Sequence, residues 1–119
     1  ALASNGSIYF APYGATRVMK YNTSTSISTL VGEDYGIGND KWNGGVFTNN
    51  SVYFAPHNSK KVLKVNIDND TTQLIGPDYD GPCKWSGGVL GADGFVYFVP
   101  STAKQILRID PKNDTSELI

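Results

Sequence analysis

Two segments of the 119-residue chain repeat a set of side chains that could hold a ligand. Each segment has an aspartate followed by a tyrosine, and then a lysine followed by a tryptophan. An aromatic ring can stack on a sugar or a peptide, and polar groups beside the ring can fix the orientation of that ligand. The sequence therefore predicts a binding site on one rim of the protein, formed by Asp34, Tyr35, Lys41, Trp42, Asp78, Tyr79, Lys84 and Trp85.

The same residues also fit a purely structural role. A tryptophan that returns in every repeat is commonly a wedge between neighbouring repeats, because each interface in a repeat protein recurs. An aspartate in a loop often bonds the backbone of that loop. Ligand contact and structural support are therefore both open interpretations of these eight residues.

Catalytic chemistry finds little support in the sequence. His57 is the only histidine, which leaves no multi-histidine metal site within one chain, and its loop shares no chemistry with the equivalent loops. Cys83 is the only cysteine, which excludes an intrachain disulfide and a cysteine-based zinc site. The acidic residues lie mostly in turns, without a pair placed for acid–base work. We expect no catalytic residues, no metal and no cofactor.

Charge and hydropathy exclude two classes of partner. The formal net charge is −1 and the isoelectric point is about 5.7, whereas a nucleic-acid-binding protein needs a basic face. No apolar run approaches the roughly 18–20 residues of a membrane helix. We therefore expect neither nucleic-acid binding nor membrane insertion.

A repeat of 44 residues organises the chain around these candidate residues. Asn5–Pro12 returns as Asn49–Pro56 and as Asp93–Pro100. Each copy has turn residues that tolerate positive φ, a run of β-branched and aromatic residues, and a proline that ends the strand. Each copy therefore predicts the second strand of a hairpin.

Four strands can be assigned to each repeat. The first is the Trp-x-Gly-Gly-Val segment at 42–48 and 85–91, of which only residues 1–4 remain in the first repeat. The second is the strand described above. The third covers 17–22, 61–66 and 105–110, and the fourth covers 28–32, 72–76 and 116–119. No helical period is present.

Antiparallel four-stranded units of this length, with short turns inside and longer links between them, predict an all-β fold of β-propeller blades. We expect one three-blade segment over residues 1–119, with blades at about 1–38, 39–81 and 82–119. The paired glycines of the first strand fit this fold, because innermost strands crowd together at the central axis.

The pattern Lys-Trp-x-Gly-Gly-Val, followed by Asn/Asp-Gly-x-Val-Tyr, Pro and Val-Leu-x-Ile-Asp, resembles the repeats of uncharacterised β-propeller proteins of protists and algae. It is more distantly similar to kelch-like and lyase-type propellers. The resemblance covers the whole chain and implies a propeller fold. It implies little about function, since propellers include enzymes, lectins and scaffolds.

Three blades do not close a ring, because propellers have roughly 4–8 blades. An open arc leaves one apolar blade face bare at each end. We therefore expect a closed ring of at least about six blades, completed by another copy of the chain or by further propeller blades.

The leading hypothesis is a non-enzymatic binding or assembly module, a scaffold whose loop rim contacts a protein or glycan ligand. The alternative is a segment of a propeller enzyme of lyase or hydrolase type, whose active site lies largely in other blades.

Five asparagines lie in N-x-S/T sequons, which is half of the asparagines in the chain. Asparagine, serine and threonine are also ordinary turn residues, so the sequons have a structural explanation as well. The functional interpretation is a glycosylated, extracellular protein. N-glycans need exposed turns, so we expect occupancy first at Asn22, Asn69 and Asn113 and later at Asn5 and Asn49.

Overall fold

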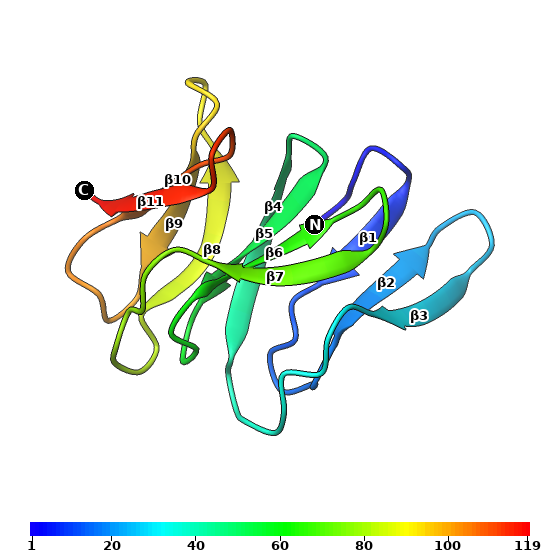
Figure 1. Cartoon of the computed structure of the whole chain (residues 1–119), viewed down its shortest axis with the longest axis horizontal. Coiled ribbons are helices and arrows are strands. Elements are labelled where there is room, and N and C mark those ends of the chain that lie inside the picture. The colour runs from blue at the N-terminus through cyan, green and yellow to red at the C-terminus, as the bar shows by residue number, and fades with distance from the viewer.

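The computed structural model describes all residues, 1–119, as eleven antiparallel strands in three sheets (Figure 1). Blade 1 contains β1 (Ser7–Phe10), β2 (Val18–Asn22) and β3 (Ile27–Val31). Blade 2 contains β4 (Trp42–Thr48), β5 (Ser51–Pro56), β6 (Val62–Asn66) and β7 (Thr71–Ile75). Blade 3 contains β8 (Trp85–Leu90), β9 (Val96–Pro100), β10 (Leu107–Asp110) and β11 (Thr115–Leu118). The predicted all-β propeller-blade fold is confirmed.

Each sheet follows the chain in an up-and-down order. β4 to β7 form one four-stranded sheet and β8 to β11 form another, with neighbours in sequence paired along each sheet. Blade 1 has three strands, and only an isolated bridge between Leu2 and Ile8 stands in the place of its inner strand. This agrees with the prediction that the first repeat lacks most of that strand.

Several strand ends differ by a residue or two from the prediction. The third strands begin at Val18, Val62 and Leu107. The fourth strands cover 27–31, 71–75 and 115–118, one residue earlier than predicted. The turn before each fourth strand closes on a residue with positive φ, and Gly32 and Gly76 adopt positive φ just after two of these strands. A residue with positive φ leaves the β region, so these positions bound the strands.

The inner strands of blades 2 and 3 meet at the axis through glycine. A Cβ on Gly44 would lie 2.3 Å from the Cα of Gly87, so the backbones of β4 and β8 touch there. Both glycines have positive φ, and both strands carry a bulge beside them. This confirms the expected crowding of the Gly-Gly segments.

Two apolar cores lie between the blades rather than within them. The first joins one face of blade 1 to blade 2 through residues that include Tyr9, Val18, Trp42 and Phe54. The second joins the opposite face of blade 2 to blade 3 through the equivalents Tyr53, Val62, Trp85 and Phe98. Each blade thus has two different faces. In blade 2, Phe54 lies on the face that packs against the preceding blade, and Tyr53 lies on the face that packs against the following blade.

Candidate binding site and the contacts that hold the blades together

The loops of the blades form two rims. The hairpin rim consists of the turns at 4–6, 23–26, 49–50, 67–70, 91–95 and 111–114. The connector rim consists of the loops at 11–17, 32–41, 57–61, 76–84 and 101–106, and its two long connectors lie along the lower side of Figure 1. Six of the eight predicted binding residues lie in the two long connectors of this rim, and Trp42 and Trp85 are the first residues of the strands that follow them, β4 and β8.

Trp42 and Trp85 are buried between the blades, each with 3% of its surface exposed. Their indole N–H groups donate to the carbonyls of Lys61 and Gln105, both at 2.8 Å. The edges of Tyr35 and Tyr79 pack against the two indoles, with ring centroids 5.1 Å apart in each pair. The indole faces are therefore covered by protein in this structure.

Lys41 and Lys84 are also buried, which the sequence did not indicate. The Lys84 ammonium donates to the carbonyls of Gly81, Ser59 and His57 at 2.7, 2.9 and 3.1 Å. It therefore ties its own connector to the loop of blade 2. Burial lowers the pKa of Lys84 below the ordinary lysine value. Lys41 makes a single bond of this kind, to the carbonyl of Gly38 at 3.0 Å.

The aspartates and tyrosines are more accessible. Asp34 accepts the N–H of Gly36 in its own loop at 2.8 Å, and Asp78 forms an exposed ion pair with Lys61 at 3.1 Å. The hydroxyl of Tyr35 donates to Thr72 at 2.8 Å, and the hydroxyl of Tyr79 lies 2.7 Å from that of Ser116.

A hollow of about 400 Å³ brings four of the predicted residues together. Its lining includes Asp78, Tyr79, Lys84, Trp85, Asp80 and Lys104. A smaller hollow of about 300 Å³ lies at the equivalent place in the other interface and includes Tyr35, Trp42 and Lys60. The larger hollow offers carboxylates and an ammonium to a polar ligand.

His57 and Cys83 have local structural contacts. The His57 side chain is buried, and its Nδ1 lies 2.9 Å from the carbonyl of Trp85. Cys83 is a half-buried loop residue with φ of 52°, and its N–H donates to Asn58. No group of three or more His, Cys, Asp or Glu residues is placed to hold a metal ion. No helix is long and apolar enough to cross a membrane.

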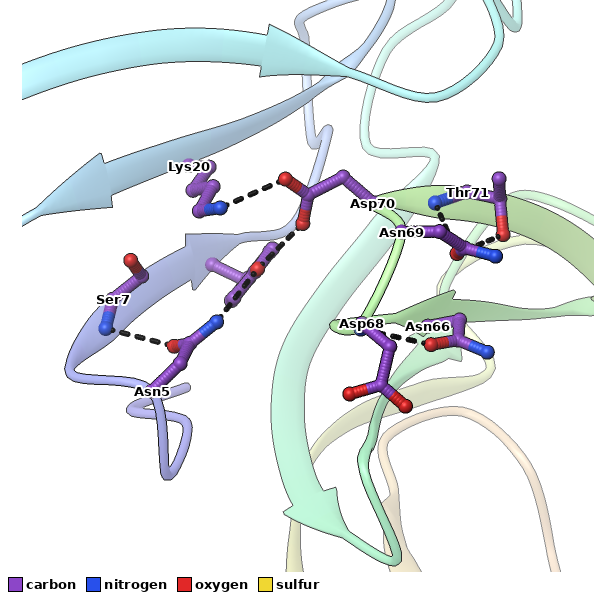
Figure 2. A network of polar contacts seen from close by, with 9 residues as sticks. Asn5, Ser7, Lys20, Asn66, Asp68, Asn69, Asp70 and Thr71 are labelled. Atoms are coloured by element: carbon purple, nitrogen blue, oxygen red, sulfur yellow. Dashed lines mark hydrogen bonds and ion pairs between the residues drawn. The ribbon is translucent and has the colours of Figure 1, made fainter.

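A polar clamp crosses each blade interface at the hairpin rim, and Figure 2 shows the one between blades 1 and 2, with Lys20 and Asp70. In the first clamp, Asp70 of blade 2 accepts the Tyr9 hydroxyl at 2.6 Å and the Lys20 ammonium at 2.8 Å. In the second, Asp114 of blade 3 accepts the Tyr53 hydroxyl at 2.7 Å and the Lys64 ammonium at 2.6 Å. One carboxylate thus takes two donors from the preceding blade, which joins neighbouring blades with charge-assisted bonds.

Burial raises the pKa of the Tyr9 and Tyr53 hydroxyls, and the hydrogen bonds to Asp70 and Asp114 raise it further. The bond to Asp70 likewise raises the pKa of Lys20. Sequence reasoning did not identify the clamp. Its signal was the return of tyrosine, lysine and aspartate at equivalent positions of consecutive repeats, with Ser26 replacing the aspartate in blade 1.

The equivalent donors of blade 3, Tyr97 and Arg108, bond within their own blade. The Tyr97 hydroxyl donates instead to Asp93 of its own hairpin, at 2.5 Å. Arg108, at the position of Lys20 and Lys64, pairs with Glu117 of its own sheet. In blades 1 and 2 the equivalent tyrosine and lysine bond to an aspartate of the next blade, whereas in blade 3 the tyrosine and the arginine bond to carboxylates of their own blade.

All five sequon asparagines lie at the hairpin rim. They differ in whether the side-chain amide nitrogen, Nδ2, donates a hydrogen bond within the chain. The Nδ2 of Asn49 donates to the carbonyl of Pro111 at 3.0 Å, and that of Asn5 donates to the Tyr9 hydroxyl at 3.3 Å. Asn69 and Asn113 are exposed and accept the hydroxyls of Thr71 and Thr115, each at 2.7 Å. Asn22 accepts the N–H of Ser24 at 2.9 Å. The Nδ2 groups of Asn22, Asn69 and Asn113 have no partner within the chain.

No protein-family model matches the sequence, and no curated protein matches it. Similarity to solved structures is found along the whole chain. A streptogramin B lyase superposes with a TM-score of 0.75 at 22% identity, over 99% of this chain and 38% of the lyase. The virginiamycin B lyase of Staphylococcus aureus gives a TM-score of 0.77 at 16% identity, over 100% of this chain and 39% of the lyase.

The extracellular domain of a one-component system from B. thetaiotaomicron gives a TM-score of 0.67 at 15% identity, over 98% of this chain and 17% of that chain. The chain thus spans about two fifths of the lyases it resembles. These similarities support the β-propeller-type fold, in agreement with the interfaces described above.

Proposed function

We propose that the chain is a non-enzymatic assembly and binding module of the β-propeller type. Its two end faces would dock another copy of the chain or further propeller blades, and its connector rim would contact a protein or glycan ligand. The observation that carries the proposal is the state of three equivalent phenylalanines. Phe54 and Phe98 are fully buried at blade interfaces, whereas Phe10 is 48% exposed on the end face of blade 1.

Other residues of both end faces support the assembly role. Met19 on blade 1 is exposed, while its equivalents Leu63 and Leu107 are buried. On blade 3, Val89, Val99 and Ile106 are exposed, whereas Val46, Ala55 and Val62 at the same positions of blade 2 are buried. An exposed apolar surface of this kind marks an interaction site. The exposed face of blade 1 corresponds to the faces of blades 2 and 3 that pack against the preceding blade. The exposed face of blade 3 corresponds to the faces of blades 1 and 2 that pack against the following blade. Further blades are therefore the partners that fit both ends.

Sedimentation velocity on the purified chain tests the assembly role. We expect a species larger than the 12.9 kDa monomer, since association buries both end faces. Met19→Lys and Ile106→Lys should each shift the distribution towards monomer. Ile37→Lys is the matched control, because Ile37 is fully exposed on the connector rim. A monodisperse, stable 12.9 kDa monomer would contradict the proposal.

The ligand-binding role rests on the hollow beside Tyr79. Screening the chain against a glycan and peptide array, with Asp78→Ala and Lys104→Ala as variants, tests this role. Loss of a detected ligand in both variants, with an unchanged melting temperature, supports binding at the hollow. Binding unaffected by both substitutions would place the ligand elsewhere.

A propeller enzyme of lyase or hydrolase type has weaker support. Lyases are among the similar solved structures, but at identities of 22% and 16% they support the fold alone. Within this chain, the single histidine is buried against the backbone of Trp85.

An extracellular, glycosylated form also belongs to this proposal. One similar structure is an extracellular domain. N-glycan attachment uses the amide nitrogen of asparagine, and Asn22, Asn69 and Asn113 keep that nitrogen unbonded. Intact-mass analysis after secretion from eukaryotic cells should show glycans at these three sites before Asn5 and Asn49. The bare polypeptide mass would contradict the glycosylated form.

A further inference from the structure

The turn between β2 and β3 of blade 1 differs from its two equivalents in where it carries its sequon. In blades 2 and 3 the sequon asparagines, Asn69 and Asn113, lie within the turn. In blade 1 the sequon begins at Asn22, the last residue of β2. The residues at the position of Asn22 in the other blades, Asn66 and Asp110, begin no sequon. The attachment site of blade 1 is therefore on the sheet itself, three residues before the equivalent site of the turn.

The cross-strand neighbour of this asparagine is also different. Asn22 lies directly opposite Ile27, the first residue of β3. The Ile27 side chain is 58% exposed, whereas blades 2 and 3 have threonine at this position, Thr71 and Thr115. Threonine and isoleucine both favour strands, so the strand does not require the apolar residue. The isoleucine thus occurs only in the blade whose opposite residue can carry a glycan.

A hollow of about 320 Å³ lies over this pair, on the face of blade 1 that packs against blade 2. It is lined by Lys20, Asn22, Thr25, Ile27 and Thr29. The Lys20 ammonium is engaged by Asp70 of blade 2 at 2.8 Å, so the lining has no free charge. What remains is one apolar side chain beside hydroxyl groups, which suits a neutral group that is apolar on one side and polar on the other.

The amide of Asn22 is held so that only its nitrogen is available. Its Oδ1 accepts the N–H groups of Ser24 and Thr25 at 2.9 and 3.3 Å, which fixes the amide against the turn. Its Nδ2 is the atom that N-glycosylation modifies. In that reaction Nδ2 loses one proton and bonds to C1 of an N-acetylglucosamine, whose bond to a lipid diphosphate breaks.

We propose that the first N-acetylglucosamine of a glycan on Asn22 packs over Ile27 in this hollow and stabilises the fold of blade 1. The ring C–H groups and the acetyl methyl of the sugar cover the isoleucine, and its polar groups meet the hydroxyls of Thr25 and Thr29. Because side chains directly opposite on antiparallel strands lie about 5 Å apart, a sugar on Asn22 is within reach of Ile27. The inference rests on the proposed glycosylated form, to which it adds a structural role for one glycan.

The test compares two forms of the full chain. One is secreted from eukaryotic cells and trimmed with an endoglycosidase that leaves a single N-acetylglucosamine at each site, and the other is made in bacteria without glycans. Ser24→Ala removes the sequon while it keeps Asn22 and its bonds to the turn. We expect this substitution to lower the melting temperature of the glycosylated form by about 4 °C more than that of the bacterial form, since it exposes the surface that the sugar covers.

Two further variants show whether the contact with Ile27 is responsible. In an Ile27→Thr background, which has the residue of the other blades, Ser24→Ala should change both forms equally. Thr71→Ala is the matched control, because it removes the sequon of Asn69, which has no isoleucine opposite it, and it should also change both forms equally. The inference is overturned if Asn22 is occupied and Ser24→Ala affects both forms alike, or if the difference persists in the Ile27→Thr background.

Intact-mass analysis separates this inference from the proposed glycosylated form. An occupied Asn22 without a gain in melting temperature contradicts the packing alone. An unoccupied Asn22 contradicts glycosylation at this site, and the packing is then tested on the bacterial chain with Asn22→Cys and Cys83→Ser, in which the new thiol is alkylated with an iodoacetamide derivative of N-acetylglucosamine. Attachment should raise the melting temperature in this chain and leave it unchanged when Ile27→Thr is added. No rise in either chain overturns the inference.

Discussion

The interface between blades 2 and 3 and the outer face of blade 3 are built from equivalent residues in different surroundings. Tyr53 and Lys64 are held by Asp114 across the interface, whereas Tyr97 and Arg108, at the same positions one repeat later, bond to carboxylates of their own blade. Val62 is fully buried, and its equivalent Ile106 is 39% exposed. The comparison shows that blade 3 carries, at the positions that blade 2 uses to pack against its neighbour, side chains that are exposed or bonded within their own blade.

The largest effect expected within an interface is that of a tryptophan. Trp85→Ala should lower the free energy of unfolding by about 5 kcal/mol, the upper end of the range for large buried aromatics, because the indole also loses its bond to Gln105. Chemical denaturation measures this loss. Val89→Ala, on the exposed face of the same strand, should cost less than about 0.5 kcal/mol. A melting temperature unchanged by Trp85→Ala would show that the ring is not a wedge between blades.

The phenylalanine pair tests the comparison with identical side chains. Phe54→Ala should cost about 3–5 kcal/mol, because the ring is fully buried between blades 1 and 2. Phe10→Ala should cost less than about 0.5 kcal/mol in a monomer, because the same position on blade 1 has no neighbour. Equal losses in stability would mean that the end face of blade 1 is covered.

The clamps can be tested by exchanging residues between equivalent turns. Asp114→Ser, which gives blade 3 the residue of blade 1, should cost about 1–3 kcal/mol by leaving the buried Tyr53 hydroxyl without its acceptor. Ser26→Asp is the matched control and should change stability little, since Ser26 is exposed and its side chain has no partner from another blade. Both positions have nearly the same φ, 57° and 58°, so backbone strain is matched. If Asp114→Ser leaves the free energy of unfolding unchanged, the clamp does not stabilise the interface between blades 2 and 3.

The smallest effect is a pH dependence in the alkaline range. The pKa values of Tyr9 and Tyr53 are raised in the folded chain, so the unfolded chain loses these protons first as the pH passes about 10. The tyrosines therefore stabilise the fold fully below that pH, and this contribution is lost as the pH rises towards their folded pKa values. Lys84 acts in the opposite direction, because its pKa is lowered.

Denaturation of the native chain and of Tyr53→Phe at increasing pH isolates the tyrosine contribution. The native chain should lose stability more steeply than the variant above about pH 10. Parallel curves would show that Tyr53 titrates alike in the folded and unfolded chain.

The strands and their order could be predicted because they depend on local pattern. Turn residues, β-branched runs and the Gly-Gly segments recur at a fixed spacing, and these define blades without reference to distant residues. The polar contacts between blades could not be predicted in the same way. Tyr9 and Asp70 are 61 residues apart, and Lys20 and Asp70 are 50 apart. A lysine or aspartate of this kind is ordinarily a solvated surface residue.

Lys84 shows the same limit within the candidate site. Its position beside Trp85 suggested an accessible ligand contact, but three backbone carbonyls surround its ammonium. Those carbonyls face it only because the connector folds over the loop of blade 2. The hollow beside Tyr79 likewise depends on how two blades meet, which a single repeat does not specify. Ligand contact by the eight rim residues stays a prediction.

The contact between Gly44 and Gly87 has a geometric consequence for the angle between blades 2 and 3. The blades radiate from their inner strands, so the distance between neighbouring inner strands determines the angle between neighbouring blades. Here the backbones of the two inner strands are in contact, so a methyl group on Gly44 would push β4 and β8 apart. The angle between blades 2 and 3 is therefore governed where their inner strands meet, by two residues that have no side chain.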